Sequence, residues 1–169
     1  MTILETERLT LRKLSVDDAP FMLDLLNQPS FIQFIGDRGV RTLDDARDFI
    51  AKRYIPAYER LGFGIYLTSL KEDQTPIGIC GLVKRDGLDD VDVGYAYLPK
   101  YWSKGYASES VSAVLAYARD ELGIHRILGI TTPDNTGSIR VLEKAGLKFE
   151  RMVTLPGEEA DLKLFAMDV

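Results

Sequence analysis

The pattern of apolar and polar positions divides the chain into short alternating runs and longer runs with helical spacing. Leu9 and Leu11 alternate with polar neighbours, which predicts a first strand near residues 8–13 because successive strand side chains point to opposite faces. Further apolar or alternating runs are bounded by turns rich in glycine, aspartate and proline. These runs predict six more strands, at residues 64–70, 76–84, 91–98, 126–131, 148–154 and 162–168.

Four helices are predicted between these strands, at residues 15–27, 42–61, 105–122 and 135–145. The first two begin with the spacing of a capping box, Ser15-Val-Asp-Asp18 and Thr42-Leu-Asp-Asp45. Pro56 predicts a kink in the second helix, since proline lacks the N–H that a helix interior needs. The segment that contains Phe31 and Phe34 is predicted to be a loop.

The resulting order of elements is strand, two helices, three strands, helix, strand, helix and two strands. This order is an α+β pattern built on one mostly antiparallel sheet. No repeat, low-complexity tract or linker interrupts it, so residues 1–169 are expected to form a single domain. The last strand, residues 162–168, could pair within the chain or across the edge of a homodimer.

Composition narrows the classes of partner. A net charge of −5 argues against nucleic acid as the main partner and is compatible with cationic amines. No apolar run approaches the roughly 20 residues of a membrane span, and no leader opens the chain, so no membrane partner is expected. The single cysteine, Cys80, fits a reducing cytoplasm and reads as a buried hydrophobic residue. With His125 as the only histidine, no metal site is expected.

The stretch from Tyr97 to Val111 joins a strand-like run to a helical one. Gly105 and Ala107 lie at the first turn of the predicted helix and leave its backbone nearly bare. A helix N-terminus carries unpaired N–H groups and partial positive charge, so a phosphate group could bind there. Taken by itself, such a turn is more typical of an ordinary connection between a strand and a helix.

Three segments give the chain a resemblance to a known family. Pro99 precedes Gly105-Tyr106-Ala107 by the spacing of motif A in the GNAT acyltransferases, although Trp102 stands where most members have Gln or Arg. The segments Leu4–Ala19 and Asn135–Gly146 are similar to the branch of ribosomal-protein N-terminal acetyltransferases. Together the three matches cover nearly the whole chain in the right order.

The resemblance implies a twisted, mostly antiparallel sheet of about seven strands flanked by four helices, with strands four and five splayed. It also implies a function: transfer of an acetyl group from acetyl-CoA to a primary amine, by direct attack in a ternary complex. The amine would belong to a protein N-terminus or to a small molecule. The alternative is an acyl-CoA-binding or regulatory domain with little or no turnover. A module for another nucleotide is disfavoured, because the chain lacks a Gly-x-x-x-x-Gly-Lys-Ser/Thr loop.

The expected cofactor-binding residues belong to the strand-to-helix stretch and to the start of the last helix. They are Tyr97, Leu98, Trp102, Ser103, Lys104, Gly105, Tyr106, Ala107, Ser108, Asn135 and Ser138. By resemblance, the backbone N–H of Tyr97 would stabilise the oxyanion, and Ser138 would lie near the sulfur. As an alternative to ligand binding, Asn135 or its neighbour Asp134 caps the last helix.

The sequence gives weaker signals for the general acid and the general base than for cofactor binding. Many GNAT members place a tyrosine acid on the last helix, where this chain has Leu142. A coenzyme A thiol, with a pKa of roughly 8.5, leaves without much help. Asp92 is the candidate base, and its alternative is a solvent-facing strand residue.

The acceptor pocket is expected to be walled by Phe31, Phe34, Tyr54 and Tyr95, all of which could equally be core aromatics.

Overall fold

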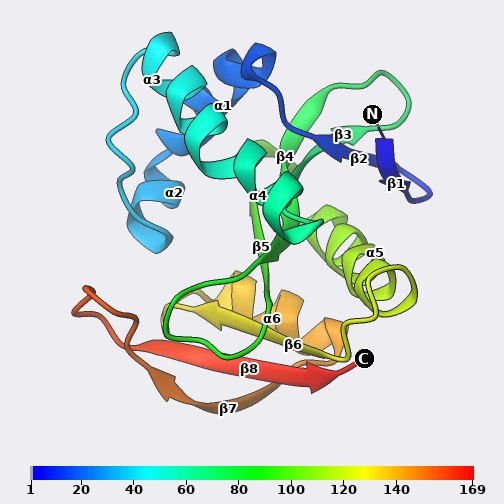
Figure 1. The fold of residues 1–169 in the computed structure, drawn as a ribbon, viewed down its shortest axis with the longest axis vertical. Helices are drawn as coiled ribbons and strands as arrows, with labels where there is room; N and C mark the ends of the chain where they lie inside the picture. The colour runs from blue at the N-terminus through cyan, green and yellow to red at the C-terminus, as the bar shows by residue number, and fades with distance from the viewer. Residues whose placement is uncertain (1) are drawn as a thin grey trace.

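The computed structural model describes residues 2–169 and contains one eight-stranded sheet in the order β1-β2-β3-β4-β5-β6-β8-β7 (Figure 1). Neighbouring strands are antiparallel except for β5 and β6, which are parallel. The strands are β1 (Thr2–Glu5), β2 (Leu9–Lys13), β3 (Ile65–Leu70), β4 (Pro76–Val83), β5 (Asp92–Tyr97), β6 (Arg126–Thr131), β7 (Lys148–Val153) and β8 (Leu162–Asp168).

The predicted α+β class is confirmed, with one strand more than expected. The additional strand, β1, is four residues long and pairs with β2 through an irregular register. So short a strand shows no clear alternation, which explains why the pattern missed it. The last strand, β8, lies between β6 and β7 of the same chain, so it pairs within the monomer.

The helices are α1 (Ala19–Leu26), α2 (Pro29–Phe34), α3 (Leu43–Phe49), α4 (Ile55–Leu61), α5 (Tyr106–Asp120) and α6 (Thr136–Ala145). Both predicted capping boxes are present, at Ser15 and at Thr42. The prediction of a loop around Phe31 and Phe34 was wrong, because these residues form α2. Pro29 occupies its first turn, where the missing N–H costs nothing, and this was the overlooked start signal.

The kink expected in the second helix is a π-turn, Ile50–Tyr54, between α3 and α4. Pro56 lies in the first turn of α4. Proline has no N–H to donate to the carbonyl four residues earlier. The helix accommodates this by a π-turn just before Pro56, in which hydrogen bonds join residues five apart, such as Ile55 N–H and the Ile50 carbonyl.

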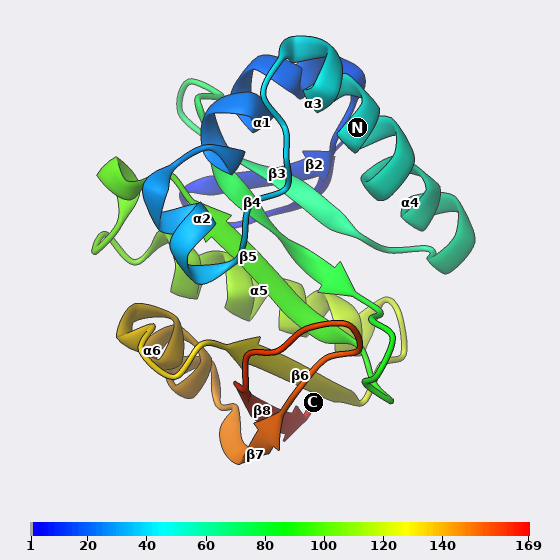
Figure 2. The ribbon, with the colours of Figure 1, turned by 90° about the vertical axis from the view of Figure 1, so that its left-hand side faces the viewer.

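Two cores cover the two faces of the sheet. One packs α5 and α6 against Val93 and Tyr97 of β5. The other packs α1, α2 and the α3–α4 segment against the opposite face, including Ala96 and Leu98. Figure 2 shows α5 behind the sheet and α1 to α4 in front of it and above it. The side chains of β5 therefore alternate between the two cores, as the sequence pattern predicted.

Candidate active site

The backbone of β5 has an open edge toward β6. Leu98 N–H donates to the Ile77 carbonyl of the β4 side at 3.0 Å. Because the hydrogen-bonding direction alternates along an antiparallel strand, Tyr95 and Tyr97 direct their N–H and C=O groups away from β4. Within residues 2–169, the single register pair between β5 and β6 is Asp92 with Leu128. Beyond it the strands diverge, and an extended chain could add to the free edge of β5.

The connection from β5 to α5 ends in a turn of exposed backbone. Ser103 and Gly105 both have positive φ, +61° and +84°, on either side of Lys104. Alternating backbone conformations of this kind turn successive N–H groups toward one point and form a concave anion site. Gly105 is the N-cap of α5, and no side chain caps this helix. The first amides of α5 therefore remain available to an anion.

A second element holds this turn in place from the other end of the sequence. The Arg8 guanidinium donates to the Lys104 carbonyl at 3.0 Å and to the Glu109 carboxylate at 2.8 Å. It also lies 4.4 Å from the centre of the Tyr106 ring. Thr6 donates its hydroxyl to the same carboxylate. We call Thr6, Arg8 and Glu109 the turn anchor.

The turn anchor was missed by sequence reasoning. Arg8 and Glu109 are 101 positions apart, and no local pattern connects them. The available signal was the match of Leu4–Ala19 to the family, which contains Thr6 and Arg8. The sequence therefore does not show that Arg8 and Glu109 form an ion pair, because only the folded structure brings them together.

Glu109 makes the turn anchor sensitive to acid. Burial opposes ionisation, but hydrogen bonds from Thr6 and Arg8 outweigh it and lower the pKa of Glu109 below its usual 4.5. A lowered folded-state pKa means that the stabilisation is present above pH 4.5 and is lost as the pH falls through the folded value. We expect Glu109→Gln to lose less stability than the parent between about pH 5 and 3, as measured by urea unfolding. Parallel pH curves for the two proteins would contradict this role.

Trp102, which stands at the unusual position of motif A, folds back over the strand end. Its indole N–H donates to the Tyr97 carbonyl at 2.9 Å, while its side chain stays largely exposed. The bond occupies the one outward carbonyl at the end of β5. The backbone N–H of Tyr97 remains directed toward β6, where it was expected to act.

The side chains of Tyr95 and Ser138 meet between β5 and α6. The Tyr95 hydroxyl lies 2.7 Å from Ser138 Oγ and 3.1 Å from the Ser138 carbonyl oxygen. Asn135 Oδ1 accepts from the Ser138 N–H at 3.2 Å, so Asn135 and not Asp134 is the cap of α6. The cap uses only the amide oxygen of Asn135, and within residues 2–169 its Nδ2 group forms no hydrogen bond.

Sequence analysis predicted no phenol near Ser138, because this chain has Leu142 at the position on α6 where many GNAT members have a tyrosine. Leu142 is buried against Gly129 of β6. The fold supplies a phenol from β5 instead, in Tyr95. Burial raises the pKa of Tyr95, against the opposing effect of its hydrogen bond to Ser138. This phenol therefore stays protonated at neutral pH.

The side chain of Tyr97 takes no part in this arrangement. Its hydroxyl is buried against Ser110 of α5, and Ser110 in turn donates to the Ala107 carbonyl at 3.0 Å. Burial raises the pKa of Tyr97 well above its usual value. Cys80 lies in the same core, and burial raises the pKa of its thiol to about 12, so it is not a nucleophile.

Asp92 is not the solvent-facing residue that sequence reasoning favoured. It is 1% exposed, and its carboxylate accepts from Arg85 Nε at 3.1 and 3.2 Å. Burial raises its pKa, while Arg85 opposes the rise. Asp92 begins β5, three residues or about 10 Å along the strand from Tyr95, and its side chain points to the opposite face of the sheet. The structure therefore does not bring it together with Tyr95 and Ser138.

The aromatic residues expected to wall the acceptor pocket are divided between the two faces. Phe31 and Tyr54 are buried in the same core, and Phe34, at the end of α2, is half-buried outside it. Tyr95 belongs to the opposite face, with α6. The structure thus groups Phe31 with Tyr54 on one face of the sheet and places Tyr95 beside Ser138 on the other.

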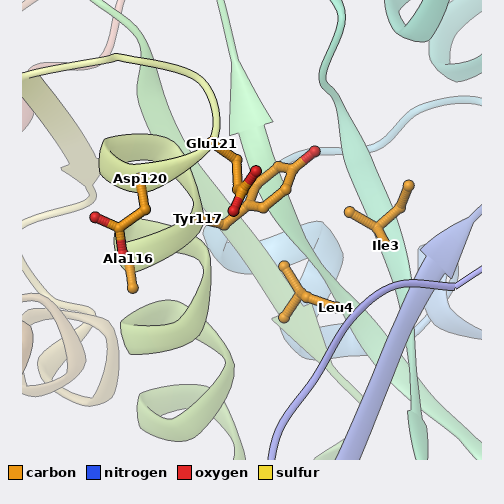
Figure 3. Close-up of a pocket in the computed structure, with 6 residues that line it drawn as sticks. All are labelled: Ile3, Leu4, Ala116, Tyr117, Asp120 and Glu121. Atoms are coloured by element: carbon orange, nitrogen blue, oxygen red, sulfur yellow. The ribbon is translucent and has the colours of Figure 1, made fainter.

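Hollows on the surface do not add to the site at β5. The one in Figure 3, of about 370 Å³, lies between β1 and the C-terminal half of α5, with Ile3, Leu4 and Tyr117 in its wall. A second, of about 340 Å³, touches Arg8 and Tyr106 beside the turn anchor.

No helix within residues 2–169 combines the length and apolar character needed to cross a bilayer. The same residues hold no group of three or more His, Cys, Asp or Glu side chains suited to a metal ion.

Comparison with known proteins gives consistent matches. A family model described as "Acetyltransferase (GNAT) domain" matches residues 8–148. The uncharacterized N-acetyltransferase YnaD of Bacillus subtilis is 30% identical over 145 residues, which cover 86% of this chain and 82% of the relative. A GNAT-family acetyltransferase from Bacillus anthracis superposes with a TM-score of 0.80 at 28% identity, covering 99% of this chain and 98% of the other.

A further solved structure supports the fold alone. RimL, a ribosomal L7/L12 alpha-N-protein acetyltransferase in complex with coenzyme A, has a TM-score of 0.85 at 18% identity. The superposition covers 100% of this chain and 98% of that one.

Proposed function

Because the chain belongs to the GNAT acetyltransferase family, we propose that it moves an acetyl group onto a primary amine by direct attack in a ternary complex. Acetyl-CoA is its cosubstrate, as in the rest of this family of acetyltransferases. The amine would belong to a protein N-terminus or to a small molecule. The proposal includes a cytoplasmic location, in keeping with the single buried cysteine.

The observation that carries the proposal is the open edge of β5 leading directly to the uncapped turn at Gly105. The turn offers backbone N–H groups and helix-dipole charge to a pyrophosphate, with Lys104 and Ser108 alongside. The free N–H and C=O groups of Tyr95 and the free N–H group of Tyr97 suit the extended amide-containing arm of coenzyme A.

Three groups of the chain can assist the chemistry. The backbone N–H of Tyr97 is fixed in the strand and needs no reorganisation to stabilise a developing oxyanion. Ser138 Oγ can donate to the departing sulfur, and Tyr95 orients it. Because burial raises the pKa of Tyr95 above that of a coenzyme A thiol, roughly 8.5, the phenol acts as a hydrogen-bond partner for Ser138 and not as the net proton source, and the sulfur leaves as the thiolate. The amine can lose its proton to solvent, since Asp92 lies remote from these groups.

The proposed role of Tyr95 and Ser138 predicts a matched kinetic effect. We expect Tyr95→Phe and Ser138→Ala each to lower kcat about tenfold, the loss of one buried hydrogen bond. The KM for acetyl-CoA should change little. Since the two side chains act as a unit, the double variant should lose little more than either single variant.

Tyr117→Phe serves as the control, because this phenol lies at the far end of α5. The pH profile of Tyr95→Phe should run parallel to that of the parent up to about pH 10, since the phenol does not titrate in this range. Additive losses in the double variant would contradict a shared role.

The decisive test of the proposed function measures release of the coenzyme A thiol from acetyl-CoA. Purified protein would be incubated with a panel of peptide N-termini, amino acids, polyamines and aminoglycosides. Release that depends on one amine class, with a mass shift of one acetyl group in that amine, is the expected result. Tight binding of acetyl-CoA with no release for any amine would instead favour a regulatory acyl-CoA-binding domain.

A further inference from the structure

Two buried hydroxyl groups join the end of β5 to the first turn of α5. The Tyr97 phenol is hydrogen-bonded to Ser110 Oγ, and Ser110 Oγ donates to the Ala107 carbonyl at 3.0 Å. A serine hydroxyl carries one hydrogen, which here goes to the carbonyl, so the phenol donates to Ser110. The Ser110 side chain is fully buried and Tyr97 is 7% exposed, so water does not compete for these bonds. We call Tyr97 and Ser110 the hydroxyl pair.

Tyr97 is also held by two other segments of the chain. Its ring lies across Gly78 of β4, where a built Cβ would stand 2.3 Å from Tyr97 Cδ1 and 2.8 Å from Cε1. Glycine at this position therefore gives the ring the room it needs to reach α5. At the other end of the residue, the Trp102 indole N–H donates to the Tyr97 carbonyl at 2.9 Å. The ring, the phenol and the carbonyl of Tyr97 are each in contact with a different segment.

The hydroxyl pair lies between the two parts of the proposed cofactor site. On the strand, the backbone N–H of Tyr97 points away from β4, because the neighbouring Leu98 N–H donates to the Ile77 carbonyl of the β4 side. On the helix, Ala107 belongs to the first turn of α5, which follows the uncapped turn at Gly105. Both groups are proposed to contact the same molecule of acetyl-CoA.

The covalent connection between these two parts does not fix their separation. Residues 99–105 run over the surface and are mostly exposed. Val111 and Val114 pack α5 against the core that contains Tyr97, but apolar contacts have little directional preference. A hydrogen bond has a preferred length and angle. The hydroxyl pair therefore supplies the directional contact between the end of β5 and the first turn of α5.

We propose that Ser110 is a positioning residue for acetyl transfer. Through the Tyr97 phenol and the Ala107 carbonyl, it fixes the backbone N–H of Tyr97 relative to the turn that binds pyrophosphate. This inference rests on the proposed function and adds to it a residue that the cofactor motif does not include. Because Ser110 is fully buried, it acts through its two neighbours and not by touching a substrate.

The effect of losing the hydroxyl pair should fall on the transition state. The arm of coenzyme A is flexible, so the pyrophosphate can bind at the turn when β5 is displaced slightly. The oxyanion exists only during the reaction, and its stabilisation requires a donor that is already in place. An interaction made only in the transition state changes kcat and leaves KM unaltered.

Three variants separate positioning from stabilisation. Tyr97→Phe leaves Ser110 bonded to the Ala107 carbonyl, so no buried donor loses its partner. Ser110→Ala leaves the buried phenol without an acceptor and should be the least stable in urea unfolding. The double variant Tyr97→Phe/Ser110→Ala removes both hydroxyls and should regain stability. We expect kcat to fall about tenfold in all three, with the KM for acetyl-CoA unchanged within about twofold.

Tyr58→Phe is the matched control for loss of a buried phenol. The Tyr58 hydroxyl accepts from the Leu14 N–H and donates to the Ile65 carbonyl at the start of β3, away from β5 and α5. This variant should lose stability and keep the kcat of the parent. A parent-like kcat in Tyr97→Phe and in the double variant would show that the hydroxyl pair only stabilises the fold and would overturn the proposal. A raised KM at unchanged kcat would overturn it as well.

A spectroscopic measurement tests the position of the Tyr97 N–H without turnover. Acetyl-CoA labelled with ¹³C at the acetyl carbonyl is added to each protein without an amine, and the carbonyl signal is followed by NMR. A hydrogen bond from the Tyr97 N–H polarises the carbonyl, so the signal should move downfield from that of free acetyl-CoA in the parent. The movement should shrink in Tyr97→Phe and in the double variant and persist in Tyr58→Phe.

This measurement also separates failure of the inference from failure of the proposed function. If no amine releases coenzyme A thiol, a downfield movement that shrinks in Tyr97→Phe would keep the role of Ser110 and reject the proposed transfer. No movement in the parent, or the same movement in every variant, would reject the role of Ser110 whether or not an amine is acetylated.

Discussion

Replacing Gly105 with valine should weaken acetyl-CoA binding at least tenfold while the protein remains folded. Gly105 has φ +84°, and a Cβ built there lies 3.3 Å from Arg8 Nη2. A β-branched residue is strained at positive φ, and its bulk would cover the N–H groups that a pyrophosphate must approach. Calorimetric titration with acetyl-CoA measures the loss of affinity, and thermal unfolding reports the fold.

Gly123→Val is the matched control for backbone strain. Gly123 has φ +66°, follows the C-terminal end of α5, and has nothing within 4 Å of a built Cβ. Both variants should lose about 1–3 kcal/mol of stability, but only Gly105→Val should lose affinity. Equal affinities in two folded variants would remove the turn from the cofactor site.

Replacing Arg85 with methionine should destabilise the protein by about 3 kcal/mol at neutral pH. Asp92 is 1% exposed and would remain buried without Arg85, the cation with which it forms an ion pair. Burial already raises the pKa of Asp92, and loss of Arg85 would raise it further. When the folded pKa exceeds the unfolded one, the folded state binds more protons, so stability falls as the pH rises through that window.

The cost in Arg85→Met should therefore shrink on acidification, as followed by urea unfolding at a series of pH values. The double variant Arg85→Met/Asp92→Asn should regain most of the lost stability, because the buried group no longer carries a charge. Arg47→Met is the control for an exposed pair and should cost at most about 1 kcal/mol. A pH-independent cost in Arg85→Met would show that lost packing, and not the buried carboxylate, is responsible.

The elements that sequence reasoning predicted well are those with a strong local signal. The capping boxes at Ser15 and Thr42 fixed two helix starts, and the glycines at 105 and 146 lie at ends of α5 and α6. The bounds of β6 and β8 agree with the apolar runs. In each case neighbouring residues carry the information, and tertiary contacts do not override it.

The site was predictable only where it is built from backbone. The turn at Gly105 follows from small residues at a strand-to-helix junction, and glycine at positive φ needs no distant partner. The pairings of Tyr95 with Ser138, Arg85 with Asp92 and Arg8 with Glu109 depend on which elements lie side by side. A single sequence does not contain that geometry in readable form, so neither the burial of Asp92 beside Arg85 nor the phenol beside Ser138 was predicted.

The turn anchor has a consequence for engineering of the cofactor site. Residues 97–111 are continuous in sequence, yet the conformation of this segment depends on hydrogen bonds from Thr6 and Arg8, about a hundred positions earlier. Transferring residues 97–111 to another protein would move the turn without the side chains of Thr6 and Arg8, which bind Glu109 and Lys104. Fusions or truncations that disturb the hairpin of β1 and β2 would likewise loosen the turn at residues 103–105, which Arg8 contacts through the Lys104 carbonyl. The N-terminal hairpin is therefore expected to support the proposed cofactor site, although no cofactor motif lies in it.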